Sequence, residues 1–269
     1  MDLKTLCQSV VELAKNTGQY IRDESQNSKQ IKTKGKNDFV THVDKGAEER
    51  IVARLSELLP EAGFIAEEGS STKVGDRYNW IIDPIDGTTN FIHGLFPHAI
   101  SIALQDNDIK SKEIVLGVVY ELGLNECFYS WKDAPAYLNG EVITVSQAPK
   151  IADSLLATGF PYANFERMEG FMKSLDYFMK NSHGLRRLGS AAVDLAYVAC
   201  GRFEGFYEYG LQSYDVAAGA FLVQQAGGHN CDFSGGKNYL YGQEIISSNA
   251  LIFKEFKKVI YNLMYGESE

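Results

Sequence analysis

A short apolar strand that ends in two carboxylates is the feature that most constrains this chain. The segment reads WIIDPIDGTTN from Trp80 to Asn90, and the apolar run begins at Tyr78. A run of this length before a turn-forming segment is typical of a buried strand. We therefore predict a strand over residues 78–82, with Asp83 and Asp86 just beyond its end.

The rest of the chain alternates between helical and strand patterns. Apolar residues recur at helical spacing over 3–21 and 43–58, and helices are also predicted at 166–180, 191–200, 216–226 and 251–263. Strands are predicted at 98–104, 114–120, 126–130 and 203–207, with a hairpin turn at Asn139-Gly140. The Lys- and Gly-rich residues 32–41 indicate a mobile loop. We expect a mixed α and β protein with two tightly coupled halves, 1–145 and 146–269, and a candidate site between them.

Composition excludes several classes of protein. Of the 269 residues, 45% are hydrophobic, which is enough for a large core and argues against disorder. The 26 basic and 35 acidic residues give a net charge of −9, which argues against a nucleic-acid binder. The four cysteines form no CxxC pair, and no apolar run is long enough to span a membrane. Reduced thiols favour a cytoplasmic location.

The end of the predicted strand suits a metal ion and a phosphate group together. Mg²⁺ prefers oxygen ligands and is commonly bound by one or two carboxylates plus substrate phosphates. Asp83 and Asp86 supply two carboxylates, and the following Gly87-Thr88 supplies a hydroxyl and backbone N–H groups at a possible helix N-terminus. The alternative interpretation is an acidic surface turn.

Four further acidic residues, in three segments, belong to the same hypothesis. Glu67 and Glu68 follow an apolar stretch in FIAEEGS, Asp215 begins a strongly apolar helix, and Asp44 opens the helix over 43–58. On local grounds alone, Glu67 and Glu68 could be solvated loop charges. Asp44 and Asp215 could cap their helices.

Taken together, these segments resemble the inositol monophosphatase family of magnesium-dependent, lithium-sensitive phosphatases. The resemblance rests on NDFVTxxD, EEG, WIIDPIDGTTN and YDVAAGAFLVxxAGG, which run in the family's order from about Lys34 to Gly228. It implies an α/β fold, a layered α-β-α-β-α sandwich of the type shared with fructose-1,6-bisphosphatase, and a homodimer. Tyr214 stands where the family usually has Trp, and Gln225 where it usually has Glu.

The resemblance also implies roles for individual residues. Two or three Mg²⁺ ions would be bound by Glu67, Asp83, the carbonyl of Ile85, Asp86 and Asp215. Thr88, hydrogen-bonded to Asp44, would orient the attacking water near Glu67. Substrate contacts would come from Asp86, Gly87, Thr88, Ala191 and Glu208. Lys34 would lie in a mobile loop near the site.

The expected activity is hydrolysis of inositol monophosphates to inositol and phosphate, with no nucleic-acid or membrane partner. Alternative substrates within the superfamily are the 2′-phosphate of NADP(H), fructose 1,6-bisphosphate and 3′-phosphoadenosine 5′-phosphate. A haloacid-dehalogenase-like phosphatase is disfavoured, because its DxDxT motif is one residue shorter than the Asp83–Asp86 spacing. The third alternative is a non-catalytic phosphate-binding regulator.

Overall fold

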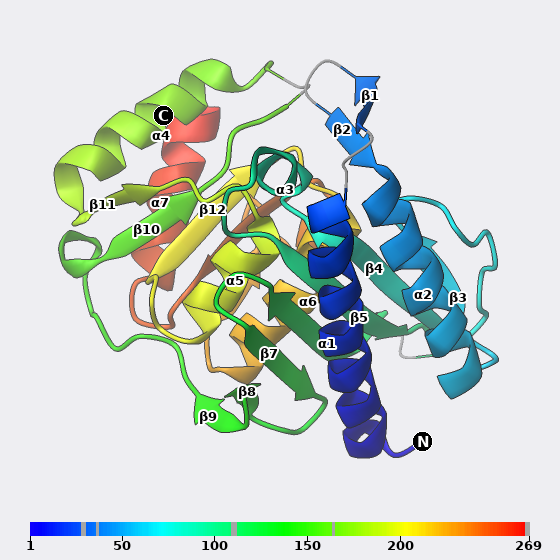
Figure 1. Cartoon of the computed structure of the whole chain (residues 1–269). Helices are drawn as coiled ribbons and strands as arrows, with labels where there is room; N and C mark the ends of the chain where they lie inside the picture. Colours follow the sequence, from blue (N-terminus) through cyan, green and yellow to red (C-terminus); the bar gives the residue numbers. More distant parts are fainter. Residues whose placement is uncertain (28–30, 36–37, 109–111, 163–164, 267–269) are drawn as a thin grey trace.

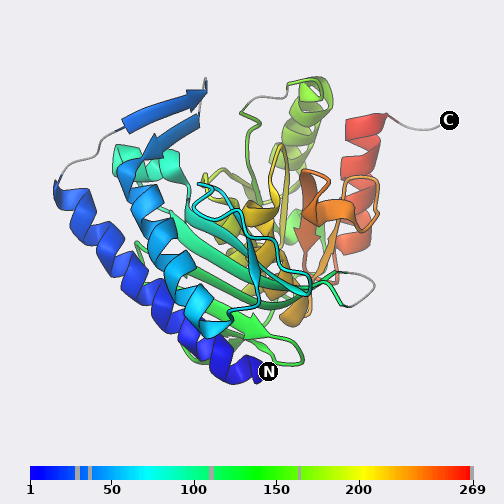
Figure 2. The same ribbon diagram turned by 90° about the vertical axis from the view of Figure 1, so that its right-hand side faces the viewer.

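Helices and sheets alternate through the molecule in five layers (Figures 1 and 2). The computed structural model describes residues 1–27, 31–35, 38–108, 112–162 and 165–266. From one side to the other, the layers are a helix pair, a seven-stranded sheet, a second helix pair, a five-stranded sheet and a third helix pair. This arrangement confirms the layered α-β-α-β-α sandwich.

The elements have the following bounds. The helices are α1 (Leu3–Asn27), α2 (His42–Leu58), α3 (Thr88–His93), α4 (Met168–Asn181), α5 (Ala191–Ala199), α6 (Ser213–Gln225) and α7 (Phe253–Tyr265). The strands are β1 (Ile31–Gly35), β2 (Asp38–Thr41), β3 (Gly63–Ala66), β4 (Tyr78–Asp86), β5 (Ala99–Asp106), β6 (Glu113–Glu121), β7 (Glu126–Trp131), β8 (Ala136–Leu138), β9 (Glu141–Ile143), β10 (Leu155–Thr158), β11 (Gly184–Arg186), β12 (Gly205–Tyr209), β13 (His229–Cys231) and β14 (Glu244–Ser248).

The large sheet is covered on one face by α1 and α2. Its strand order is β3-β4-β5-β6-β7-β8-β9, in which only β3 and β4 run parallel. The apolar stripe of α1 includes Val10, Ala14 and Ile21, which are fully buried against the sheet and α2. Every residue of β4 is buried, as expected for a strand with helices on both faces.

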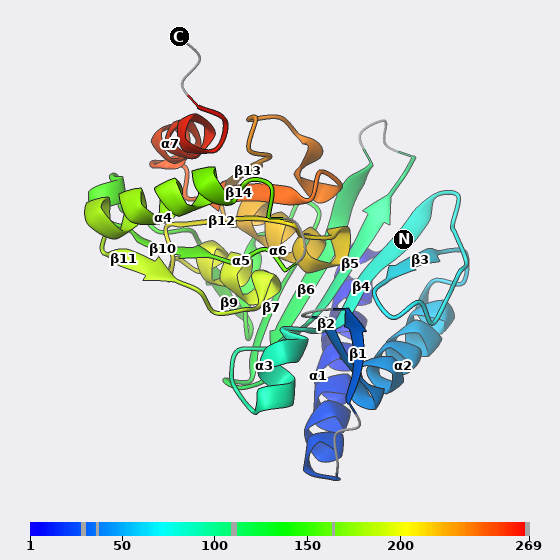
Figure 3. The same cartoon turned by 90° about the horizontal axis from the view of Figure 1, so that it is seen from above.

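The central layer consists of α5 and α6, which lie between the two sheets (Figure 3). Both helices are apolar on nearly all sides because they have no face toward solvent. They approach closely at Gly219, where an added Cβ would lie 2.5 Å from the Cβ of Leu195. Small residues in this layer therefore allow α5 and α6 to pack closely against each other.

The smaller sheet has the strand order β11-β10-β12-β14-β13 and is covered on its outer face by α4 and α7. Its outer core is aromatic, with Phe171, Phe178 and Phe256 fully or almost fully buried around Tyr207. This cluster ties the last helix of the chain to the sheet.

Most predicted elements are present, with shifts of a few residues. The loop prediction for residues 32–41 is wrong, because β1 and β2 pair there as an antiparallel hairpin. The Lys- and Gly-rich composition favours a loop, but the backbone pairing between β1 and β2, which composition alone does not indicate, forms a hairpin instead. Lys34 lies in β1, and its side chain is outside the described part of the structure. The predicted strand at 203–207 lies two residues later, as β12.

Two other expectations concern turns and membranes. The turn at Asn139-Gly140 is confirmed: it joins β8 to β9, and both residues have positive φ, 50° and 99°. No helix among the described residues is long and apolar enough to cross a membrane.

Candidate metal centre and active site

The parallel pairing of β3 and β4 brings the first two acidic segments together. Ala66 pairs with Ile82, so Glu67, directly after β3, lies beside Asp83 in β4. The backbone N–H of Glu67 donates to the carbonyl of Ile82 at 3.2 Å. Strand β3 was not among the predicted elements, although the apolar residues before Glu67 were noted.

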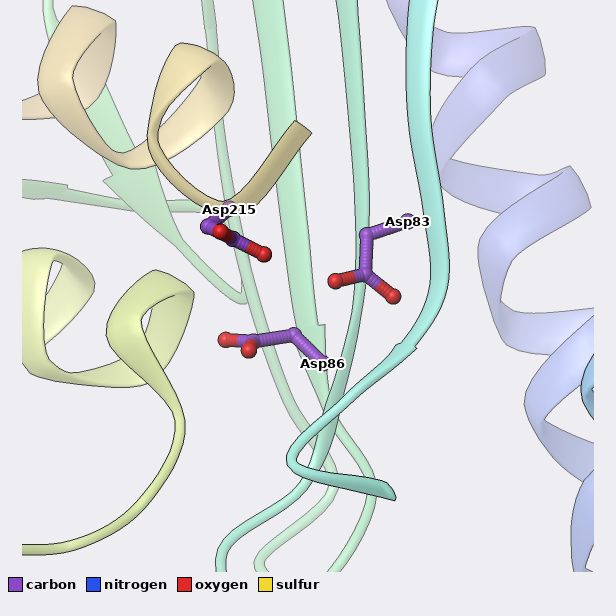
Figure 4. A group of neighbouring side chains, drawn as sticks. All are labelled: Asp83, Asp86 and Asp215. Carbon is purple, nitrogen blue, oxygen red and sulfur yellow. The ribbon is translucent and has the colours of Figure 1, made fainter. Parts of the chain in front are cut away.

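A bulge in β4 turns Asp83 and Asp86 toward the same space. The prediction placed both carboxylates beyond the strand, but β4 continues through Asp86. Residues three apart in a regular strand point to opposite faces. Here Asp83 pairs with Ser101 and Asp86 with Ala99, so β4 contains one extra residue and the two side chains converge (Figure 4).

Helix α6 supplies the third carboxylate from the other side. Asp215 lies in the first turn of α6, as predicted, and accepts a hydrogen bond from the backbone N–H of Gln212 at 2.6 Å. Asp215 therefore helps to cap α6, and its side chain also faces β4. Asp83, Asp86 and Asp215 each offer an oxygen within 4.8 Å of the other two, within the part of the chain that the structure describes (Figure 4).

Burial and neighbouring carboxylates raise the pKa values of Asp83 and Asp215. Burial, followed by the charge of Glu67, raises the pKa of Asp83 well above its usual range. Burial and then the charge of Asp86 do the same for the pKa of Asp215. Buried like charges at this separation need a counter-charge or protons. A donor set made only of hard oxygens fits Mg²⁺, which would supply that counter-charge.

Asp86 is also bound by the N-terminus of α5. Its Oδ2 accepts hydrogen bonds from the Ser190 hydroxyl at 2.6 Å and from the Ala192 backbone N–H at 2.7 Å. Burial raises the pKa of Asp86 to about 6, while these two bonds act in the opposite direction. Ser190 was not among the predicted site residues. A serine directly before an apolar helix is a common N-cap pattern, and Ser190 does cap α5, but its bond to Asp86 has no local signature.

These residues surround one cavity of about 300 Å³ between the strand ends and α5. Nine predicted site residues line it: Glu67, Asp83, Ile85, Asp86, Gly87, Thr88, Ala191, Glu208 and Asp215. The tenth, Asp44, is buried in α2 and is not among the described lining residues. Sequence patterns distributed over 149 positions, from Glu67 to Asp215, thus meet at a single site.

The wall beside Asp86 consists of a tight turn and a short helix. Gly87 has φ 90°, and an added Cβ would lie 3.1 Å from the carbonyl oxygens of Pro97 and Gly189. Glycine is therefore required there on both conformational and steric grounds. Thr88 begins α3, and its hydroxyl donates to the Ile85 carbonyl at 3.0 Å.

The opposite end of the cavity contains Glu208 and Arg187. Glu208 lies on β12 over Gly159, where an added Cβ would lie 2.0 Å from its carboxylate oxygens. Burial, followed by the charge of Asp86, raises the pKa of Glu208 to about 8, and Arg187 opposes this rise. Arg187 donates to the Tyr162 hydroxyl at 2.8 Å. It is the only Lys or Arg among the described residues that line the cavity.

Comparisons with known proteins agree with this geometry. A model of the inositol monophosphatase family matches residues 2–264. An inositol-1-monophosphatase of Mesorhizobium japonicum is 38% identical over 86% of each chain, and Nus factor SuhB of Vibrio cholerae is 40% identical over 89% of each. The crystal structure of extragenic suppressor protein suhB from Bartonella henselae superposes with a TM-score of 0.88 at 34% identity, covering 95% of this chain and 98% of that one. The chain therefore belongs to the inositol monophosphatase family.

Proposed function

We propose that this chain is a Mg²⁺-dependent phosphomonoesterase that hydrolyses inositol monophosphates to inositol and phosphate. The observation that carries the proposal is the convergence of Asp83, Asp86 and Asp215 in one cavity with Glu67 beside them. A phosphate monoester carries nearly two negative charges at neutral pH, so carboxylates alone would repel it. The proposal therefore requires a cation between the carboxylates and the phosphate.

Four carboxylates and one carbonyl would hold two or three Mg²⁺ ions. These are Glu67, Asp83, Asp86, Asp215 and the carbonyl of Ile85, all of which line the cavity. When bound, the metal supplies positive charge to the phosphate and lowers the pKa of a coordinated water. The bonds from Ser190 and Ala192 to Oδ2 of Asp86 hold this carboxylate in one orientation.

The other residues would position water and substrate. We assign Thr88, with Asp44 and Glu67, to orienting the attacking water, which would approach in line with the leaving alcohol. The backbone N–H groups of Gly87 and Thr88 would contact the phosphate. Ala191 and Glu208 would contact the alcohol. Phosphoryl transfer then depends mainly on positioning and charge stabilisation, and no covalent enzyme intermediate is needed.

The decisive experiment is phosphate release from purified protein with and without Mg²⁺. The substrates are myo-inositol 1-phosphate, NADP⁺, fructose 1,6-bisphosphate and 3′-phosphoadenosine 5′-phosphate, each also with Li⁺. We expect Mg²⁺-dependent, Li⁺-sensitive turnover that is fastest on myo-inositol 1-phosphate. Faster turnover of NADP⁺ or of the bisphosphate would reassign the substrate within the same reaction class.

A second candidate is a regulatory role, favoured by the relatives that are named Nus factor SuhB. The cavity and its carboxylates support catalysis, and the two roles can coexist on one chain. No turnover on any of the four substrates, with Mg²⁺ bound, would leave the regulatory role as the better assignment.

The remaining features of the proposal concern the whole protein. We propose that the protein is a cytoplasmic homodimer. Within each chain, the halves 1–145 and 146–269 both contribute to the site, since Asp86 and Asp215 come from different halves. Sedimentation of the purified chain tests the dimer.

A further inference from the structure

A buried glutamate on α2 contacts the segment that contains Glu67. Glu48 is completely buried, and both of its carboxylate oxygens accept backbone hydrogen bonds. Oε2 accepts from the N–H of Glu68 at 2.7 Å, and Oε1 accepts from the N–H of Ser70 at 2.7 Å. Bonds of this length to a charged acceptor are among the stronger ones in proteins.

These two bonds fix the backbone just after Glu67. Gly69, between the two donors, has φ 71°, which lets the chain turn so that both N–H groups point at one carboxylate. On its other side, the N–H of Glu67 is bonded to the carbonyl of Ile82 on β4. Glu67 is thus held between a strand and a helix, although it lies in a connection that follows β3.

We propose that Glu48 is a positioning residue for the metal centre, which it serves by holding Glu67 in place beside Asp83. This inference rests on the proposed metal site and adds a residue that lies outside the cavity. Groups that orient metal ligands commonly affect metal affinity by 10- to 100-fold. Here Glu48 holds the backbone N–H groups of Glu68 and Ser70, and its effect reaches Glu67 through that backbone.

The test compares Glu48→Gln with Glu49→Gln. Both substitutions remove one negative charge from α2, but Glu49 is exposed whereas Glu48 is buried. An amide at position 48 keeps one acceptor and places an NH₂ group against a backbone N–H, so one of the two bonds is lost. Mg²⁺ binding is measured by titration calorimetry without substrate, and turnover is measured as a function of Mg²⁺ concentration.

We expect Glu48→Gln to bind Mg²⁺ about tenfold more weakly than the unmodified protein, with turnover at saturating Mg²⁺ changed by less than about threefold. Hydrogen exchange at the amides of Glu68 and Ser70 should accelerate, while exchange in β4 to β6 stays unchanged. Glu49→Gln should match the unmodified protein in all three measurements.

Unchanged Mg²⁺ affinity in a folded Glu48→Gln protein overturns the inference and leaves the proposed function intact. Absence of Mg²⁺ binding in the unmodified protein overturns the proposed function itself. If Glu48→Gln does not fold, Glu48→Asp retains the charge but is too short to reach both N–H groups, and the same loss of Mg²⁺ affinity is expected.

Discussion

Two of the clustered aspartates have structural partners as well as a place in the cavity. Asp86 accepts hydrogen bonds from the first turn of α5, and Asp215 accepts one from the residue that caps α6. Each of these side chains is therefore oriented before any ligand arrives. Preorganisation of this kind favours tight binding, because little side-chain freedom remains to be lost.

At Ser190, the hydroxyl is expected to control the direction of Asp86. Ser190→Ala removes the 2.6 Å bond and should weaken Mg²⁺ binding by about tenfold. It should also lower the free energy of unfolding by about 1 kcal/mol, because the N-cap of α5 is lost. Ser190→Thr keeps the hydroxyl and should behave as the unmodified protein. Equal Mg²⁺ affinity in the Ala and Thr variants would contradict this prediction.

At Asp86 itself, Asp86→Asn should abolish most metal-dependent turnover. The amide oxygen can still accept from Ser190 and Ala192, so circular dichroism should show an intact fold. Asp76→Asn, at an exposed position, makes the same chemical change away from the cavity and should retain full activity. Full phosphatase activity in Asp86→Asn would refute the assigned role of this carboxylate.

At the scale of elements, Gly219 sets how closely α5 and α6 pack against each other. Glycine in a helix is ordinarily unfavourable by up to about 1 kcal/mol relative to alanine. Gly219 is retained in α6 because an added methyl group would meet Leu195 close to its backbone. Packing at this point therefore outweighs helix propensity.

The balance between packing and helix propensity predicts different outcomes for Gly→Ala substitutions at two positions. Gly219→Ala should lower the free energy of unfolding by about 1–3 kcal/mol through overpacking. At Gly46, in α2, the nearest obstacle is the hydroxyl end of the half-buried Tyr20, which can move aside. Gly46→Ala should thus be neutral or slightly stabilising. Urea unfolding of both variants tests the pair, and equal destabilisation would show that contact with Leu195 is not decisive.

At the scale of the molecule, the clustered carboxylates make the stability of the metal-free protein depend on pH. The pKa of Glu208 is about 8, against 4.5 for an ordinary glutamate. The folded state therefore holds this proton more tightly than the unfolded state does. The resulting stabilisation is complete below about pH 4.5 and is lost as the pH rises through 8. The raised pKa values of Asp83 and Asp215 act in the same direction.

We therefore expect the thermal midpoint of metal-free protein to fall by about 5 °C between pH 6 and pH 8.5. Scanning calorimetry in the presence of a chelator measures this fall. In Glu208→Gln it should be smaller, because one titrating group is absent. Adding Mg²⁺ at pH 8.5 should raise the midpoint. Identical pH dependence in the two proteins would show that Glu208 does not titrate as described.

Local patterns at strand ends and helix starts predicted that Asp83, Asp86 and Asp215 lie near such boundaries. The layered fold and the other residues of the cavity were implied by the resemblance to the family. The bulge in β4 was not predictable, since it depends on pairing with β5. The contacts of Glu48 and Ser190 were also missed, because their partners are 20 or more positions away in sequence.

The bond between Ser190 and Asp86 joins residues that are 104 positions apart. At typical rates of synthesis, roughly 5–20 s separate the translation of these two residues. Throughout that interval the Asp86 carboxylate lacks the two hydrogen bonds that it accepts from Ser190 and Ala192. Metal-binding geometry is thus acquired only after α5 has been translated and docked. A nascent chain that stalls before Ser190 would contain two of the three clustered aspartates but not their arrangement.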